Sequence, residues 1–223
     1  MRIVSGNSTY LQPAMMARLA RYRHEVFVHR LGWQLSCADG CEVDQFDRED
    51  TVYVVVLNKR TGAIRGTARL LPTTRPYLLR EVFPALLDDM PAPESADVWE
   101  LSRFAVVDLE APATIRNGQF SSCTATALLR ATLMCAAELG ARELVAVSPV
   151  SVQRLLRRAG VVHLGRAPRA TGTKPRATCA VSDISDISDT SDLFACRIEV
   201  VPFPVNPQCN PGAVPRAIPG AIC

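Results

Sequence analysis

Two apolar segments joined by a short turn restrict the fold of this chain more than any other feature. Thr51 to Leu57 is β-branched and almost wholly apolar, which is typical of a strand buried in the centre of a sheet. Asn58 to Gly62 contains turn-forming residues, and Ala63 to Leu71 follows as a second extended segment. The pattern therefore predicts a β-hairpin within a larger sheet.

A further strand is predicted over Asp97 to Val106, and it carries an acid and a base. Since successive side chains of a strand point to opposite faces, Glu100 and Ser102 should share one face, and Leu101 and Arg103 the other. A carboxylate on a largely apolar strand costs free energy unless it is paired or used. Glu100 is therefore expected to have a partner or a chemical task.

Strands alternate with helices in the second half of the chain, which predicts crossover connections and an α/β (α+β mixed) fold with a mixed sheet. Apolar residues at helical spacing predict helices over Gln12 to Arg30 and over Ser121 to Leu139, the second ending at Gly140. Ser151 to Ala159 is a third predicted helix, with a basic outer face. Shorter elements are expected at Arg2 to Val4, Leu78 to Leu87, Leu144 to Val147 and Leu193 to Val201.

The chain has 223 residues, 48% of them apolar, which is enough to bury one sizeable core. Residues 1–201 are therefore predicted to form a single domain. A Ser-Asp repeat with almost no core-forming residues marks a low-complexity insertion at about 166–192, and residues 202–223 form a Pro-rich tail. Leu31 to Asp50 is acidic and weakly periodic, and is predicted to be a loop.

The net charge of +3 is too small to indicate a nucleic-acid partner, and no apolar run approaches the roughly 20 residues that span a bilayer. The segment Met1 to Tyr10 lacks the pattern of a secretory signal, so a cytoplasmic protein without nucleic-acid or membrane partners is expected. The eight Cys are then expected to be free thiols. With three His and no Cys-x-x-Cys, no metal site is expected.

Opposite charges lie close to the predicted strands and to two aromatic residues. A network of buried ion pairs that fixes the loop onto the sheet would explain them, and so would a site for a charged substrate. Both interpretations remain open on the residues alone. The set comprises Arg23, Phe27, Trp33, Asp44, Asp47, Arg69, Glu100 and Arg103.

These residues belong to six motifs that, in this order, resemble the N-acyl-homoserine lactone synthases, the autoinducer synthases of bacterial quorum sensing. The motifs span about the first half of the chain, and the second half agrees in pattern through Gly160. They are Tyr22-Arg23-His24-Glu25-Val26-Phe27, Leu31-Gly32-Trp33, Asp44-Gln45-Phe46-Asp47, Ala68-Arg69-Leu70-Leu71-Pro72-Thr73-Thr74, Phe83-Pro84 and Trp99-Glu100-Leu101-Ser102-Arg103-Phe104.

The resemblance implies a GNAT-like fold, a mixed central β-sheet flanked by helices. It implies S-adenosylmethionine and an acyl chain on acyl carrier protein as substrates, with no cofactor. The amine of S-adenosylmethionine would attack the acyl thioester. Its carboxylate would then close on the γ carbon, releasing methylthioadenosine and the lactone.

An ammonium is not nucleophilic, so acyl transfer needs a proton acceptor, and Glu100 is the candidate base. The alternative is that Glu100 is only the ion-pair partner of an Arg. The resemblance further implies that S-adenosylmethionine is bound by aromatic faces and by opposite charges. The aromatic faces are those of Phe27 and Trp33, with Asp44 for the amino group and Arg23 for the carboxylate.

Asp47, Arg69 and Arg103 are assigned to an ion network that orders the Leu31 to Asp50 loop. Ser148 is assigned to the acyl-chain pocket, at a position where some family members have Thr, which leaves the acyl substituent open. Arg154 and Arg158 lie four residues apart on one predicted helix and are assigned to docking of the acidic carrier protein. A merely solvated helix face is the alternative.

Two other functions remain open. A GNAT-type N-acyltransferase using acyl-CoA is one, although no Gly-rich phosphate-binding turn precedes Ser121. A non-catalytic binding module with a basic helix is the other, although no aromatic residues for stacking accompany its arginines.

Overall fold

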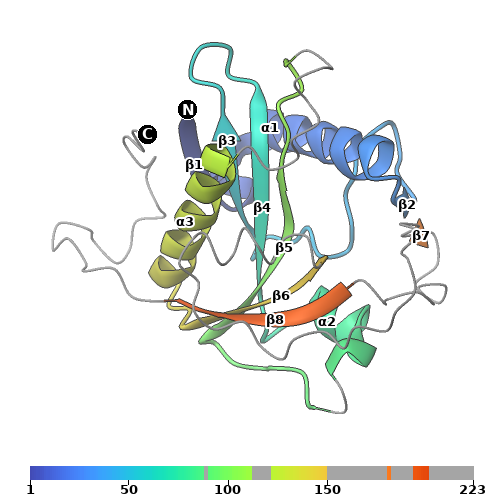
Figure 1. Cartoon of the computed structure of the whole chain (residues 1–223), viewed down its shortest axis with the longest axis vertical. Helices are drawn as coiled ribbons and strands as arrows, with labels where there is room; N and C mark the ends of the chain where they lie inside the picture. The colour runs from blue at the N-terminus through green and yellow to red at the C-terminus, as the bar shows by residue number, and fades with distance from the viewer. Residues whose placement is uncertain (88–89, 112–121, 150–179, 182–192, 201–223) are drawn as a thin grey trace, which may run out of the picture.

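The centre of the fold is a six-stranded sheet in the order β1-β3-β4-β5-β6-β8 (Figure 1). The computed structural model describes residues 1–87, 90–111, 122–149, 180–181 and 193–200. β5 and β6 are parallel, and the other neighbouring pairs are antiparallel. The strands are β1 (Arg2–Gly6), β3 (Val52–Leu57), β4 (Ile64–Pro72), β5 (Val98–Val106), β6 (Glu143–Pro149) and β8 (Leu193–Glu199). A second, two-stranded sheet joins β2 (Gln34–Leu35) to β7 (Ala180–Val181) in parallel.

Helices cover both faces of the six-stranded sheet. Val54 of β3 belongs to the same apolar cluster as Leu128 on one face, whereas Val55 belongs to the cluster of Leu19 and Tyr22 on the other. This alternation follows from the two-residue period of a strand, and it explains why every residue of β3 is buried. The helices are α1 (Ser8–Arg23), with the π-helical segment His24–Arg30 continuing it, α2 (Leu78–Glu81), the 3₁₀ turn Pro84–Leu87, and α3 (Ser122–Glu138).

Local sequence signals account for the helix ends. Asn7 caps α1 because its Oδ1 accepts the Tyr10 N–H at 3.0 Å, and Pro13 restarts the helix after Gln12, whose φ of 65° interrupts it. α3 ends at Glu138, and Gly140 just beyond it has a φ of 85°. There the Ala141 N–H donates back to the Ala136 carbonyl at 2.9 Å, as in a Schellman motif.

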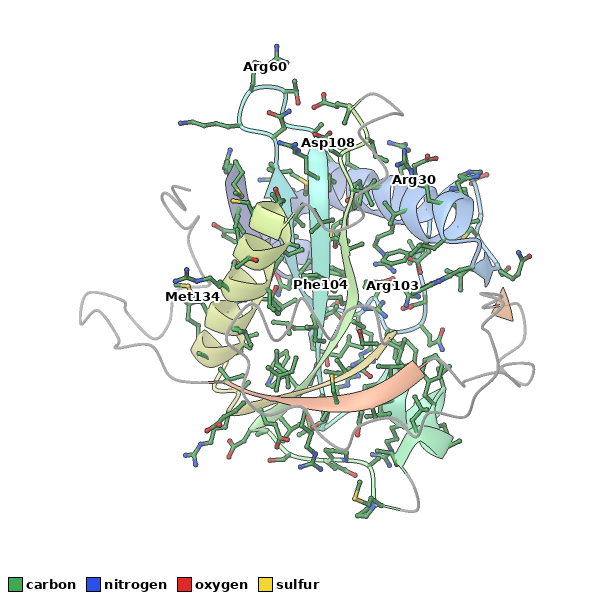
Figure 2. The ribbon with its side chains drawn as sticks, in the orientation of Figure 1. Arg30, Arg60, Arg103, Phe104, Asp108 and Met134 are labelled. Carbon is green, nitrogen blue, oxygen red and sulfur yellow. The ribbon has the colours of Figure 1, made fainter. Side chains whose placement is uncertain are left out.

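A β-bulge in β5 changes which face its residues occupy. Where β5 pairs with β4, the single residue Ala68 of β4 lies opposite two residues of β5, Arg103 and Phe104. Arg103 there adopts a left-handed φ of 49°. Figure 2 shows Phe104 and Arg103 on opposite sides of β5, Phe104 toward α3. Arg103 therefore joins the face of Glu100, and the sequence prediction that the two residues occupy opposite faces was wrong.

The parallel strands β5 and β6 separate beyond the sheet centre. They pair from Val98 with Glu143 to Leu101 with Ala146. Past that point β5 continues beside β4 and β6 continues beside β8, so the two diverge (Figure 1). Glu100 lies just before the divergence and Arg103 just beyond it.

The predicted mixed sheet flanked by helices is confirmed, as are the central hairpin and the helix ending at Gly140. The first helix differs from its prediction, since it begins at Ser8 and its last part, from His24, is π-helical. The third predicted helix, with Arg154 and Arg158, lies outside the described residues. So do the tail at 202–223 and the insertion at about 166–192, except for β7.

Most of the described cysteines are free, as the sequence led us to expect. Cys37, Cys41, Cys135 and Cys196 are free thiols, but the expectation was wrong for Cys123, which is exposed and disulfide-bonded. No helix among the described residues is long and apolar enough to cross a membrane.

Candidate active site

Arg69 of β4 is the centre of a cluster of charges on the sheet face that carries α1 and α2. Its side chain is fully buried. Its two terminal nitrogens donate to the two carboxylate oxygens of Asp44 at 2.6 and 3.0 Å, and one of them also reaches Asp47 at 3.1 Å. Its Nε donates to Ser102 Oγ of β5 at 3.0 Å. Arg69 therefore holds the acidic loop against the centre of the sheet.

Arg23, the last residue of α1, binds the same loop from the other side. Its terminal nitrogens donate to both oxygens of Asp47 at 2.7 and 3.0 Å, and its Nε donates to Glu42. Each of its three nitrogens thus has an acceptor. The family resemblance implied that Arg23 binds the substrate carboxylate, but in this structure every nitrogen of its guanidinium already donates to the loop.

Arg103 completes the cluster from the bulge in β5. Its Nε and one terminal nitrogen donate to Glu42 Oε1 at 3.2 and 2.9 Å, and that terminal nitrogen also reaches Asp44 at 2.8 Å. Three arginines and three acids therefore form one network. We call these six residues the charge network: Arg23, Glu42, Asp44, Asp47, Arg69 and Arg103.

The acidic loop folds as it does because its own polar groups are satisfied locally. Asp39 and Gly40 both have positive φ, at 53° and 67°, and the Cys41 N–H donates to the Ala38 carbonyl at 2.9 Å, which is the pattern of a type I′ turn. Next in the chain, the Glu42 N–H donates to the Ala20 carbonyl of α1 at 3.0 Å. The turn thus delivers Glu42 to the end of α1.

The charge network sets the pKa of its carboxylates. Burial raises the pKa of Glu42, but the Arg103 and Arg23 guanidiniums outweigh it and bring the pKa to about 2. For Asp47, burial is likewise outweighed by Arg23 and Arg69, so its pKa is well below the usual range. Both carboxylates are therefore charged at neutral pH.

Stability is expected to pass through a maximum in mildly acidic solution. A carboxylate whose pKa is lower in the folded than in the unfolded protein, such as Glu42, contributes stability above its unfolded pKa. That contribution is lost as the pH falls through about 2. Glu100 has the opposite effect: because its folded pKa is raised to about 7, its ionisation costs stability as the pH rises toward 7. Urea midpoints should rise from pH 8 to roughly 5 and fall below about 4. A constant midpoint down to the lowest pH would contradict this assignment.

Phe27 and Trp33 stack on each other next to the charge network. Their ring centroids are 4.6 Å apart and their planes differ by 28°. The Arg103 guanidinium carbon lies 5.6 Å from the Phe27 ring and 5.4 Å from the Trp33 ring, within cation–π range. Since Phe27 is buried, only Trp33 keeps part of its surface in contact with solvent.

Glu100 lies on the same sheet face, with its side chain turned toward α2. Its carboxylate accepts the Leu78 N–H at 2.8 Å and the Leu79 N–H at 2.7 Å. It is 1% exposed. Burial raises its pKa to about 7, although the two N–H groups and the positive charges of Arg69 and Arg103 act in the opposite direction.

Asp44 is more exposed to solvent than the arginines of the charge network to which it is bound. The side chains of Arg23 and Arg69 are 2% and 0% exposed, whereas that of Asp44 is 17% exposed. A ligand from solvent therefore meets the network at Asp44. The ring of Phe46, two residues further along the loop, has its centroid 5.9 Å from the guanidinium carbon of Arg69.

The remaining predicted site residues lie apart from this cluster or outside the described residues. Ser148 of β6 is buried and, by strand alternation from Ala146, lies on the α3 face rather than on the face of Glu100. Arg154 and Arg158 lie outside the described residues. Among the described residues, no group of three or more His, Cys, Asp or Glu side chains is arranged to hold a metal ion.

Sequence reasoning missed Glu42 and the two amides of α2. The Asp39-Gly40 pair, a strong signal for a hairpin turn, could have revealed that Glu42 is delivered to a fixed position. The amides of Leu78 and Leu79 carry no sequence signal, because every residue except proline has an N–H.

Residues 7–191 of the chain match the family model described as autoinducer synthase. The chain belongs to the autoinducer synthase family. It is 50% identical over 172 residues to an acyl-homoserine-lactone synthase of Ralstonia nicotianae, an alignment that covers 76% of this chain and 82% of that protein. The predicted resemblance is thereby confirmed, and the chain is an acyltransferase of the acyl-homoserine-lactone synthase type. The alternative of a non-catalytic binding module is set aside.

Solved structures of the family agree in fold. TofI, in a ternary complex with an inhibitor and MTA, superposes with a TM-score of 0.69 at 40% identity, covering 90% of this chain and 92% of TofI. BjaI, a CoA-dependent acyl-homoserine lactone synthase, in its structure with MTA has a TM-score of 0.69 at 25% identity, covering 90% of this chain and 83% of BjaI. The predicted GNAT-like fold is confirmed.

Proposed function

We propose that this autoinducer synthase makes an N-acyl-homoserine lactone from S-adenosylmethionine and an acyl group carried on acyl carrier protein. The observation that carries the proposal is Glu100, a buried carboxyl whose pKa is raised to about 7, beside a charge network that opens to solvent at Asp44. A base works best when its pKa lies near the pH at which it operates.

The reaction has two steps. Glu100 takes a proton from the substrate ammonium, directly or through water, and the freed amine nitrogen attacks the thioester carbonyl. The carbon–sulfur bond of the thioester breaks, and the second nitrogen proton accompanies the leaving thiolate. A carboxylate oxygen then attacks the γ carbon, and the electron pair of the breaking carbon–sulfur bond neutralises the sulfonium. Methylthioadenosine leaves, and this step needs positioning rather than a base.

The charges of the site suit a substrate that is both an ammonium and a carboxylate. Asp44, the most exposed acid of the charge network, would bind the ammonium. Trp33 would contact the adenine or the sulfonium through its accessible surface, with Phe27 stacked behind it. Asp47, Arg69 and Arg23 would hold the loop that carries Asp44. S-adenosylmethionine is a substrate in this scheme, and no cofactor is needed.

Acyl carrier protein is the proposed donor, with Arg154 and Arg158 as its docking residues and Ser148 beside the acyl chain. TofI was solved with MTA bound, which supports S-adenosylmethionine chemistry at the corresponding site. The CoA dependence of BjaI makes acyl-CoA the second candidate donor. A cytoplasmic enzyme is proposed, since both candidate donors are cytoplasmic molecules.

Incubation with S-adenosylmethionine and matched panels of acyl carrier protein and CoA thioesters tests the proposal. Mass spectrometry should detect an acyl-homoserine lactone and an equal amount of methylthioadenosine, formed faster from the carrier-protein thioesters. Faster turnover with acyl-CoA would replace the donor but keep the reaction. An N-acylated amine without methylthioadenosine would instead identify a GNAT-type N-acyltransferase using acyl-CoA.

A further inference from the structure

Glu42 joins three elements of the fold and is the most buried acid of the charge network. The residue is 1% exposed, and its two oxygens accept from different arginines, Oε2 from Arg23 at the end of α1 and Oε1 from Arg103 in β5. Its backbone N–H is fixed to Ala20. The carboxylate is therefore held between its own anchored backbone and two guanidiniums.

Arg103 differs from the other two arginines in the hydrogen bonds that it donates to the described residues. Among the described residues, every nitrogen of Arg23 and Arg69 donates a hydrogen bond, whereas in Arg103 only Nε and one terminal nitrogen do. The other terminal nitrogen has no acceptor in the described part of the chain. It lies on a guanidinium that contacts Asp44, where the network opens to solvent.

Glu42 determines which edge of Arg103 is free. By accepting from Nε and one terminal nitrogen with the same oxygen, it holds one edge of the planar guanidinium. The guanidinium carbon of Arg103 also lies within cation–π range of the stacked Phe27 and Trp33 rings, which restrain its position. A guanidinium fixed in this way can offer its remaining nitrogen only in one direction.

We propose that Glu42 is a positioning residue that orients Arg103 so that its free terminal nitrogen binds the carboxylate of the amino-acid substrate. Asp44 then binds the ammonium of the same molecule, so the two charged ends of the substrate are bound by two neighbouring side chains. The inference rests on the proposed function for the identity of the substrate. It assigns the carboxylate to Arg103 instead of Arg23, whose nitrogens are all in use.

Two ligands that differ only in the carboxylate test this role. S-adenosylmethionine and its decarboxylated analogue are titrated calorimetrically into wild type, Glu42→Gln and Arg103→Gln. In both variants the dissociation constant for S-adenosylmethionine should rise about tenfold or more, the effect of a lost charge-assisted hydrogen bond. The constant for the analogue should change less than about threefold. Glu49→Gln, in an exposed part of the same loop, is the matched control and should leave both constants unchanged.

The double variant Glu42→Gln/Arg103→Gln shows whether Glu42 acts through Arg103. If it does, the double variant binds S-adenosylmethionine no more weakly than Arg103→Gln alone. Equal weakening of both ligands in Glu42→Gln, or additive losses in the double variant, would overturn the proposal. If Glu42→Gln does not fold, Glu42→Asp keeps the charge with a shorter reach and is held to the same selectivity criterion. Wild type that fails to bind S-adenosylmethionine would instead reject the proposed function.

Discussion

Glu100→Gln is expected to slow acyl transfer by about 10²–10⁴-fold, the range that a general base contributes. The amide keeps the shape of the side chain but cannot take a proton from the substrate ammonium. S-adenosylmethionine should still bind, because the charge network is intact. Single-turnover formation of the acylated product measures the chemical step, and calorimetry measures binding in the same preparation.

The substitution also has a structural cost. Both carboxylate oxygens of Glu100 accept backbone N–H groups of α2, from Leu78 and Leu79, whereas an amide presents one oxygen and one NH₂. We expect a loss of about 1–3 kcal/mol in the free energy of unfolding. A folded variant that transfers the acyl group at nearly the wild-type rate would remove Glu100 as the base.

The pH–rate profile adds a test that leaves Glu100 in place. Since the base must be ionised, kcat/KM should rise with pH through the folded pKa of about 7. Leu78→Pro deletes one N–H that stabilises the ionised form, so the rise should move to higher pH. Proline is tolerated at the first helical position, and Tyr77 before it is extended, with φ −145° and ψ 165°.

Leu78→Ala is the matched control, because it shortens the same side chain but keeps the N–H. Two other groups that interact with Glu100 do not change protonation near pH 7. Burial lowers the pKa of Arg69, but Asp44 and Asp47 outweigh it and raise that pKa, and burial raises the pKa of Tyr77 to about 12. An identical profile in Leu78→Pro and Leu78→Ala would show that the α2 amides do not tune the base.

The elements of this fold were predictable where a periodic pattern continued without interruption. The apolar run at Val52–Leu57 and the helix ending at Gly140 are formed by the same local preferences that the sequence displays. The bulge in β5 was not predictable, because nothing in the segment Trp99 to Val106 marks a residue with left-handed φ. One extra residue reversed the face of Arg103 and thereby completed the charge network.

The candidate site was predictable as a set of residues but not as a set of contacts. Opposite charges within an apolar chain must find partners, which brought Asp44, Asp47, Arg69 and Arg103 into one group. Which acid binds which arginine depends on the turn at Asp39-Gly40 and on the packing of α1. The family resemblance implied that Arg23 binds the substrate carboxylate, and in the structure Arg23 donates to Asp47 and Glu42.

Arg69→Met is expected to cost about 3–5 kcal/mol in the free energy of unfolding, the effect of breaking a buried ion pair by removing one partner. Arg69 is wholly buried, and its loss removes three of the hydrogen bonds that the carboxylates of Asp44 and Asp47 accept. Asp47 keeps Arg23, whereas Asp44 keeps the Phe46 N–H and only one guanidinium, that of Arg103, so the loop carrying the proposed ammonium site should loosen from β4.

Arg80→Met is the matched control, because it makes the same substitution in a surface ion pair. The Arg80 and Glu94 side chains of that pair are 42% and 60% exposed. This substitution should cost less than about 1 kcal/mol. Urea denaturation of both variants at low and high salt separates the two cases, because salt screens exposed pairs far more than buried ones. Equal small losses would mean that hydrophobic packing around Phe46 and Leu71, rather than the charge network, holds the loop to the sheet. A large loss for Arg69→Met that persists at high salt would mean that the fold depends on the same ion pairs that prepare the site for a charged substrate.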